Sequence, residues 1–288
     1  MAYETSDALR TALETRLLNE ARARGVSVDR LRRLAVFERI LVRLEAAQPG
    51  NWVLKGGLAL EVRLGGYARA TRDLDLSLRA PVGDGEALFA AIVEPLGGDP
   101  DEDGFRFMMA RPTALTGDQA GRPAWRFTIE ASMAGRQFAI VRVDVVARPE
   151  ELAATERLQL PGMLAFAGIP PRQVEVVAPV QHFAEKLHAL TRTYGDRPNT
   201  RVRDLADLVL LIEAGRVEPL EAYRATSWVF AARATHDLPD EIPDPPAFWS
   251  EPYAALVHDL RVQAVTIGQA MTCLRRFWAA AQASLEES

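Results

Sequence analysis

Apolar residues recur every three or four positions over residues 7–24 and 28–47, which is the spacing of one face of an α-helix. Gly25 separates the two runs, and Ser27 is a residue type that caps helix N-termini. A short apolar segment at residues 52–54 then predicts a buried strand, and Gly56 and Gly57 mark a tight turn into a helix over residues 58–64. We therefore expect two amphipathic helices followed by a strand–turn–helix unit.

The next segments alternate apolar and polar residues with a period of two, as strands with one polar face do. Leucines alternate with Asp73, Asp75 and Ser77 in the first of them. A helix is predicted over residues 84–96, and strands over residues 105–109, 124–133 and 137–146, the last two joined as a hairpin. In the final strand, Arg142 and Asp144 share one face and valines occupy the other.

The pattern changes beyond residue 150. After a loop rich in glycine and proline and a short strand at residues 174–177, helical spacing dominates, with helices predicted over residues 179–193 and 200–215 and from residues 218 and 250 onward. The pattern predicts an α+β protein with a boundary near residues 150–178. A mixed sheet with helices would fill residues 1–170, and a mainly helical domain residues 171–288.

Composition favours a folded protein inside the cell. The chain has 288 residues, 48% of them apolar, which is enough for a substantial core. It contains no apolar run long enough to cross a membrane and no basic, then apolar leader at its start, so we expect a cytoplasmic protein without membrane contact. The single cysteine, Cys273, excludes an internal disulfide, and the net charge of −5 argues against coating of nucleic acid by bulk charge.

Only two of the 34 basic residues are lysines, Lys55 and Lys186. An arginine-rich coding bias explains the arginines. A lysine that survives such a bias is a candidate for a site that needs a compact ammonium group.

Asp73 and Asp75, two positions apart on a strand, point to the same face and can bind the same divalent cation. Oxygen ligands of this kind suit Mg²⁺. Asp144 is a candidate third ligand, or the partner of an arginine. An Asp-x-Asp pair alone also occurs on solvated strands and in nucleotide-sugar glycosyltransferases, so the context must decide.

The context includes the turn at Gly56 and Gly57, since the N–H groups at a helix N-terminus bind phosphate. Other chemistries lack support. The four histidines are scattered along the chain, which argues against a zinc site or a Ser/His/Asp triad, and there is no Gly-x-x-x-x-Gly-Lys-Ser/Thr loop.

Four blocks of sequence resemble the AbiEii family of nucleotidyltransferase toxins, which includes the mycobacterial MenT toxins. The first two are residues 54–60 (Leu-Lys-Gly-Gly-Leu-Ala-Leu) and the Arg-x-Thr-x-Asp-x-Asp pattern of residues 69–75. The others are residues 185–190 (Glu-Lys-Leu-His-Ala-Leu) and 203–208 (Arg-Asp-Leu-Ala-Asp-Leu). Their order and separations fit the family along residues 50–210, although Ala206 stands where relatives often carry an aromatic residue.

The resemblance implies a polymerase-β-like nucleotidyltransferase core and a role for each block. Its implied catalytic residues are Asp73, Asp75, Lys186 and Asp204, and its implied metal ligands for two Mg²⁺ ions are Asp73, Asp75 and Asp144. Nucleotide phosphates would be bound by Gly56, Gly57, Lys55, Arg69 and Lys186. Asp207 is expected to support the last block, and the helical domain to complete the active-site cleft.

By the same resemblance, the expected reaction is transfer of a nucleoside monophosphate from an NTP to an RNA acceptor, with release of pyrophosphate. The 3′ end of tRNA is the first choice of acceptor, and translation would be blocked as a result. A cognate antitoxin is expected as a partner. Transfer to a protein or a small molecule, or an inactive module that binds nucleotide or antitoxin, are the alternatives.

Overall fold

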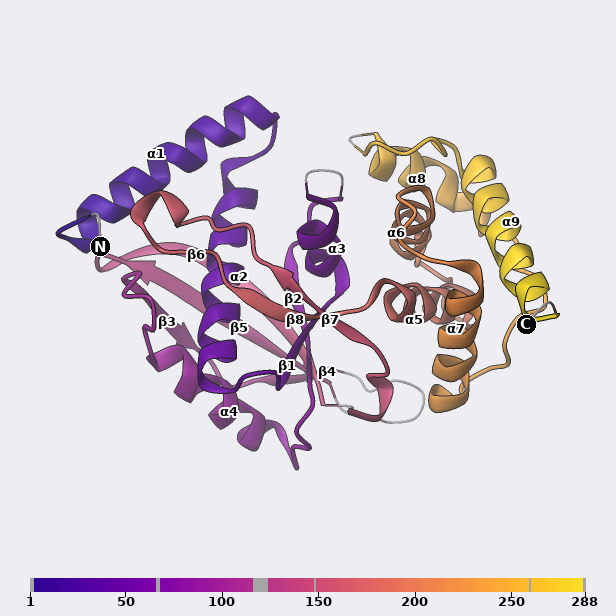
Figure 1. Ribbon diagram of the computed structural model, residues 1–288, viewed down its shortest axis with the longest axis horizontal. Helices are drawn as coiled ribbons and strands as arrows, with labels where there is room; N and C mark the ends of the chain where they lie inside the picture. Colours follow the sequence, from indigo (N-terminus) through magenta and orange to yellow (C-terminus); the bar gives the residue numbers. More distant parts are fainter. Residues whose placement is uncertain (1–2, 66–67, 116–123, 148, 259, 287–288) are drawn as a thin grey trace. The chain divides into compact units, whose positions relative to one another are not determined.

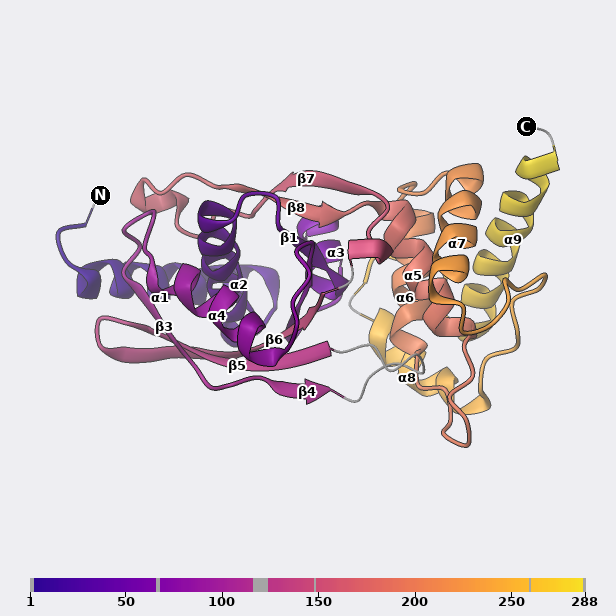
Figure 2. The ribbon, with the colours of Figure 1, turned by 90° about the horizontal axis from the view of Figure 1, so that it is seen from below.

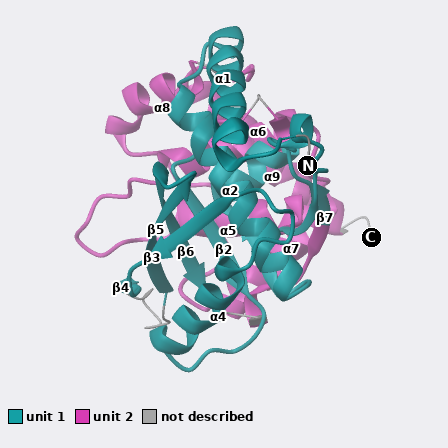
Figure 3. Ribbon diagram, turned by 90° about the vertical axis from the view of Figure 1, so that its left-hand side faces the viewer, with its two compact units in different colours: residues 1–63, 70–149, 157–176 teal, residues 64–69, 150–156, 177–288 magenta. Residues whose placement is uncertain are grey.

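The computed structural model describes residues 3–65, 68–115, 124–147, 149–258 and 260–286. The chain divides into two compact units, coloured teal and magenta in Figure 3. Unit 1 comprises residues 1–63, 70–149 and 157–176, and unit 2 comprises residues 64–69, 150–156 and 177–288.

Unit 1 is built on a mixed sheet with the strand order β3-β5-β6-β2-β1-β8-β7, to which β4 adds by pairing with β5 (Figure 1). The strands described are β1 (Trp52–Lys55), β2 (Asp73–Leu78), β3 (Phe105–Met109), β4 (Thr113–Leu115), β5 (Ala124–Met133), β6 (Arg136–Val146), β7 (Thr155–Gln159) and β8 (Gln173–Val177). β2 runs parallel to β6 and antiparallel to β1, so the sheet is mixed at its centre.

Helices cover one face of this sheet. They are α1 (Ser6–Arg24), α2 (Val28–Ala47), α3 (Gly56–Leu64) and α4 (Gly85–Gly97). The sheet curls around α2, with β5 and β6 on one side of the helix and β7 and β8 on the other (Figure 2). The buried side chains of β5 alternate along the strand from Trp125 to Met133, as expected when only one face of a strand meets the core.

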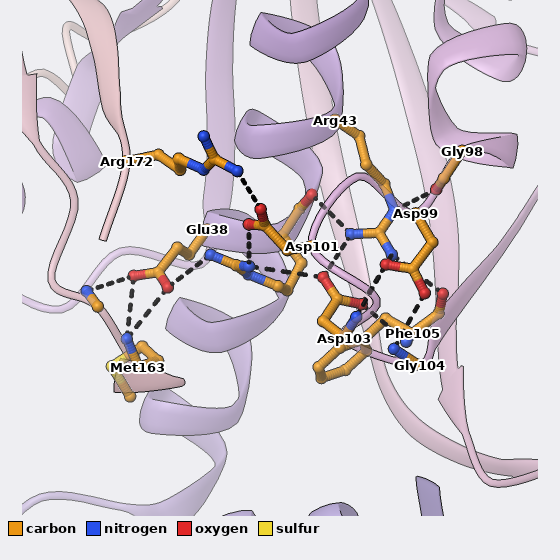
Figure 4. A network of polar contacts seen from close by, with 12 residues as sticks. Glu38, Arg43, Gly98, Asp99, Asp101, Asp103, Gly104, Phe105, Met163 and Arg172 are labelled. Carbon is orange, nitrogen blue, oxygen red and sulfur yellow. Dashed lines mark hydrogen bonds and ion pairs between the residues drawn. The ribbon is translucent and has the colours of Figure 1, made fainter. Parts of the chain in front are cut away.

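Because the sheet surrounds α2, every residue of the helix from Leu34 to Leu44 is buried, including three charged ones. Two of these, Arg39 and Arg43, bind carboxylates of the loop before β3: Arg43 donates to both oxygens of Asp103 at 2.8 and 2.7 Å (Figure 4). Glu38 accepts from the backbone N–H groups of Gly162 and Met163 at 2.8 and 3.1 Å. Pairing is what makes buried charges tolerable, and here it also fixes two loops to the central helix.

The opposite face of β3, β5 and β6 is exposed. Met108 and Ile140 are 64% and 51% exposed there, and Thr128 and Arg142 are exposed as well. The polar side chains of β2 and β6 lie on this open face. They include Asp73, Asp75 and Asp144.

Unit 2 is helical, with α6 at its centre. Its helices are α5 (Pro179–Thr191), α6 (Val202–Glu213), α7 (Pro219–Arg233), α8 (Ser250–Val257) and α9 (Ile267–Glu286). Residues Leu205 to Leu211 of α6 are all buried, because α5, α8 and α9 pack against this helix.

The predicted fold class, a mixed sheet with helices followed by a mainly helical half, is confirmed. Both N-terminal helices, the Ser27 cap, which accepts from the Arg30 N–H at 3.3 Å, and the β5–β6 hairpin are present. The sequence patterns missed β4 and β7, which have three and five residues. β4 is too short to show an alternation, and β7 (Thr-Glu-Arg-Leu-Gln) contains a single apolar residue.

Candidate active site

One row of charged side chains crosses four adjacent strands of unit 1. From β1 through β2 and β6 to β5, the residues in register are Lys55, Asp75, Asp144 and Arg126. Residues in register on neighbouring strands point to the same face. The row therefore places two carboxylates side by side, with a cation at each end.

Asp73 lies in the next row, where its register partner on β6 is Arg142. The Arg142 Nε lies 3.0 Å from the Asp73 Oδ1, an ion-pair distance, but this buried oxygen receives no hydrogen bond of good geometry. The Thr71 hydroxyl donates to the Asp73 carbonyl at 3.1 Å and so fixes the backbone at the start of β2. Thr71 has a structural role, and Asp73 keeps a carboxylate oxygen that can take a ligand.

Asp144 pairs with an arginine, one of the two alternatives the sequence left open for it. The Arg126 Nε and Nη2 donate to its two oxygens at 2.7 and 2.6 Å. The hydrogen bonds that Arg126 donates to Asp144 raise the pKa of the guanidinium, with further contributions from the negative charges of Asp73 and Asp75. Arg126 thus interacts electrostatically with all three aspartates.

Sequence reasoning missed Arg126 and gave Arg142 no role. A signal was present in the alternation along residues 124–133 and 137–146, which puts Arg126 and Arg142 on the polar faces of paired strands. Only the register shows that these polar positions lie opposite the aspartates, and residue order alone does not fix the register.

Gly56 allows Asp75 to approach the start of α3. It has a φ of +61°, a conformation that favours glycine. A Cβ added at this position would lie 1.9 Å from the Asp75 Oδ2, so the carboxylate occupies the space that any other side chain would need. Gly57 follows as a buried residue in the first turn of the helix. The Asp75 carboxylate thus lies beside the first residue of α3, and the N–H groups at a helix N-terminus can bind anions.

The donor set fits a hard divalent cation. Asp73, Asp75 and Asp144 lie on one face of adjacent strands, and Asp73 has a buried oxygen without a hydrogen-bond donor. With the side chains as they stand, no group of three or more His, Cys, Asp or Glu residues within the described ranges is arranged to hold a metal ion. Arg126 and Arg142 engage two of the three carboxylates instead.

Unit 2 contains a second charged cluster around Lys186 of α5. The Lys186 Nζ lies 3.0 Å from the Asp204 Oδ1 and 2.6 Å from the Asp207 Oδ2, both on α6. Arg69 donates to both oxygens of Asp207 at 2.8 Å. The contacts of Lys186 and Arg69 join three parts of the chain: α5, α6 and the segment that precedes β2. These parts carry three of the four sequence blocks.

The two aspartates of this cluster differ in environment. The side chain of Asp207 is 0% exposed and that of Asp204 14%. Burial raises the pKa of Asp207, but Lys186 and Arg69 outweigh it and hold the pKa below its usual value. Burial lowers the pKa of Lys186, and Asp207 and Asp204 outweigh that effect, so the lysine is charged. Asp207 fixes Lys186 and Arg69, whereas Asp204 retains contact with solvent.

Unit 2 contains further arginines, and two of them have partners within the unit. Arg275 donates to the Ile242 carbonyl at 3.1 and 3.0 Å and to Asp244 at 2.6 Å, which fastens a loop to α9. Arg201 donates to the Tyr194 hydroxyl at 3.0 Å and lies 3.8 Å from Asp204. Arg261 and Arg276 are exposed.

Comparison with solved structures identifies the class of fold. The chain is similar to MenT4, a nucleotidyltransferase toxin from Mycobacterium tuberculosis H37Rv, with a TM-score of 0.58 and 22% identity over 93% of this chain and 89% of that one. JHP933 from Helicobacter pylori matches with a TM-score of 0.43 and 16% identity, over 91% of this chain and 94% of that one. Among curated proteins, no sequence matches the chain. The fold is that of a nucleotidyltransferase.

The family follows from the sequence match. The model of the nucleotidyl transferase AbiEii toxin family, described as a type IV toxin–antitoxin system, matches residues 39–282. The chain belongs to this family, as the four sequence blocks indicated. No helix within the described part of the chain combines the length and hydropathy needed to span a membrane.

Proposed function

We propose that this toxin transfers a nucleoside monophosphate from an NTP to the 3′ end of an RNA, with tRNA as the acceptor. The row of Lys55, Asp75, Asp144 and Arg126 is the observation that carries the proposal, because it gathers carboxylates and cations on an open sheet face of a nucleotidyltransferase fold. The family supplies the NTP as substrate and an antitoxin as partner.

In this reaction, the oxygen of the acceptor hydroxyl attacks the α-phosphorus of the NTP. A new phosphorus–oxygen bond forms, the bond from the α-phosphorus to the bridging oxygen breaks, pyrophosphate leaves, and the hydroxyl proton passes to solvent. Catalysis of such a displacement depends mainly on positioning and on neutralising charge.

Asp73, Asp75 and Asp144 would hold Mg²⁺, with the buried Asp73 oxygen and the space at Gly56 as supporting observations. Two Mg²⁺ ions, when bound, supply positive charge to the attacking and leaving oxygens. The protein's own contribution in unit 1 is to fix the carboxylates, through Gly56 and through the strand register.

The phosphates of the nucleotide are assigned to Lys55, Lys186, Arg69 and the N–H groups of Gly56 and Gly57. Lys186 is a compact cation that Asp204 and Asp207 hold in place, and Asp207 likewise fixes Arg69. We propose that the carboxylates of unit 1 and the Lys186–Asp204 pair of unit 2 are both required for transfer.

RNA is the acceptor that the family resemblance implies, and extension of the tRNA 3′ end would block translation. We place the reaction in the cytoplasm, where NTPs and tRNA are available. A protein or small-molecule acceptor is the second candidate for the same chemistry, and an inactive module that binds nucleotide or antitoxin is the third.

Incubation of the purified protein with each labelled NTP and total RNA tests the proposal. We expect label on RNA of tRNA size, release of pyrophosphate, and loss of both with Asp75→Asn but not with Glu130→Gln, a matched acid on the β5 face two rows away. Label that survives RNase would assign a different acceptor. Nucleotide binding without release of pyrophosphate from the NTP, whichever acceptor is supplied, would overturn the enzymatic proposal.

The antitoxin is tested genetically. We expect expression of the toxin to stop growth and expression of a neighbouring gene to restore it. Sequencing of RNA 3′ ends after reaction with each NTP would then identify the nucleotide preferred, the tRNA modified and the number of residues added.

A further inference from the structure

Arg126 and Arg142 face the same carboxylates that the proposed function assigns to a metal. Arg126 makes two hydrogen bonds to Asp144, and Arg142 makes an ion pair with Asp73. An Asp144 oxygen cannot accept an Arg126 N–H and bind a cation in the same direction, and the Arg142 Nε, 3.0 Å from the Asp73 Oδ1, stands where a cation would approach that oxygen. The two arginines and the metal therefore compete for the same oxygens.

The solvent exposure of these ion pairs determines how much free energy is needed to break them. The side chains of Arg126 and Arg142 are 36% and 49% exposed, and those of their partners Asp144 and Asp73 are 20% and 34% exposed. Ion pairs open to solvent contribute only about 0–1 kcal/mol, because water and salt screen them, and the bidentate Arg126–Asp144 pair lies at the upper end of that range. Breaking them costs little compared with the energy of a divalent cation on three carboxylates.

Other ion pairs of the molecule show the contrast. Arg43 and Asp103 are both 0% exposed, and breaking a buried pair costs about 3–5 kcal/mol, since the remaining charge stays buried. We therefore expect Arg43 to keep its carboxylate partner in every state of the folded protein. Arg126 and Arg142 lie on the open sheet face, next to the exposed Thr128, where their side chains have room to turn.

We propose that Arg126 and Arg142 are exchangeable counter-ions, which neutralise Asp144 and Asp73 before the metal binds and then turn to the phosphate groups of the substrate. The proposal rests on the proposed function for the identity of the substrate. It makes the two arginines substrate-binding residues, placed by register beside the carboxylates.

The chemistry of guanidinium supports the second half of the exchange. Arginine presents a planar fork of donors that matches phosphate as well as carboxylate oxygens. Once the cation neutralises the aspartates, the guanidinium groups lose their partners while the negative charge of the nucleotide and RNA arrives on the same face. The positive charge thus moves from protein carboxylates to substrate phosphates.

Metal affinity tests the first half without any need for activity. Mn²⁺ alone is titrated into the full-length wild type, Arg126→Gln and Arg142→Gln, with calorimetry or the Mn²⁺ resonance signal as readout. Removal of a competing cation is expected to tighten Mn²⁺ binding about three- to tenfold. Arg106→Gln is the control, because Arg106 lies on β3 opposite Ser132, away from the aspartates, and should leave the affinity unchanged.

A purely structural role of the arginines predicts weaker Mn²⁺ binding in the glutamine variants, and not tighter binding. If Arg126 only holds the strands in place, its loss disorders the carboxylates and weakens Mn²⁺ binding, which would overturn the proposal. Arg126→Lys and Arg142→Lys keep the charge and are expected to bind Mn²⁺ as the wild type does. Tighter binding in the glutamine variants but not in these lysine variants assigns the effect to the lost charge, and either glutamine variant provides the comparison if the other fails to fold.

Substrate affinity tests the second half. With Mg²⁺ present, a non-hydrolysable NTP analogue and RNA are each titrated into the same variants. We expect at least one of the two ligands to bind about tenfold more weakly to the glutamine variants, which is the size of a lost charge-assisted contact. Unchanged affinity for both ligands would refute the transfer to phosphate.

The outcomes separate this inference from the proposed function. A wild type that transfers nucleotides, with glutamine variants whose Mn²⁺ affinity does not rise, would retain the function and reject the exchange. A wild type without transfer activity, with tighter Mn²⁺ binding in the variants, would reject the function and retain the exchange of arginine for metal.

Discussion

Asp75 and Asp144 lie directly opposite each other on the parallel strands β2 and β6, with no residue between them in the register. Like charges in this position repel each other and destabilise a sheet. The cations at the ends of the row, Lys55 and Arg126, offset the repulsion in the protein without substrate. Such a pair lowers the stability of the sheet in the absence of a bound cation, and it is therefore expected where the protein binds one.

The first prediction concerns Asp75→Asn. Loss of one of two opposed charges should leave the free energy of unfolding unchanged or raise it by about 0.2–1 kcal/mol, whereas nucleotide transfer should fall below detection. Urea unfolding and incorporation of labelled NTP are the measurements. Glu130→Gln removes an acid from the same sheet and should retain transfer. A strong loss of stability in Asp75→Asn would show that the aspartate is a structural residue.

Gly56→Ala is expected to disable the site by displacing Asp75. The added Cβ would meet the Asp75 Oδ2 at 1.9 Å, and the residue would also be strained at a φ of +61°. Gly50→Ala is the matched control, because Gly50 has a φ of +71° and open space around it. Both variants should lose about 1–2 kcal/mol of stability through backbone strain.

Only Gly56→Ala should also lose Mn²⁺ affinity and transfer activity. Calorimetry with Mn²⁺ alone, beside the transfer assay, separates the two causes. Equal losses of affinity in both glycine variants would mean that strain, and not contact with Asp75, is responsible.

Much of this arrangement could be predicted from the sequence, because local patterns determine it. The alternation around Asp73 and Asp75 predicted the strand and its polar face. The two glycines marked the change from strand to helix, although α3 begins at Gly56 itself and no separate turn precedes it. The partners of these residues depend on register and on contacts distant in sequence. Arg69 and Asp207 are 138 positions apart, and no periodicity relates them. The family resemblance assigned Arg69 to nucleotide phosphate, and in the structure Arg69 pairs with Asp207.

Asp204→Asn and Asp207→Asn are predicted to fail in different ways. Asp207→Asn leaves Lys186 and Arg69 without their buried partner and should cost about 3–5 kcal/mol of stability. Asp204 is partly exposed, so Asp204→Asn should cost about 1 kcal/mol and abolish transfer in a folded protein. Urea unfolding at pH 7 and the transfer assay distinguish the two roles. Similar stability losses would argue against the assignment of Asp207 as the structural residue.

The stability difference between wild type and Asp207→Asn should depend on pH. The pKa of Asp207 is lower in the folded protein than its ordinary value of 3.8, so its ionised form stabilises the fold above that pH. This contribution is lost as the pH falls through the folded pKa. Unfolding measured from pH 7 downward should show a constant difference to about pH 4.5 and a narrowing one below pH 3.8. A difference that narrows already near pH 6 would contradict a lowered pKa.

The last prediction concerns the charges buried around α2. Arg43 donates to Asp103 and to the carbonyls of Gly98 and Phe105, so Arg43→Met leaves a fully buried carboxylate without its main partner (Figure 4). The expected cost is about 3–5 kcal/mol in urea unfolding. Arg157→Met is the control: its guanidinium is 45% exposed and pairs with Glu45 at 2.9 Å, so its loss should cost less than about 1 kcal/mol. The double variant Arg43→Met with Asp103→Asn should recover part of the stability, because residue 103 is then no longer an unpaired buried carboxylate. If the double variant is less stable than Arg43→Met, Asp103 is held by contacts other than Arg43, and the arginine is not what makes its burial tolerable.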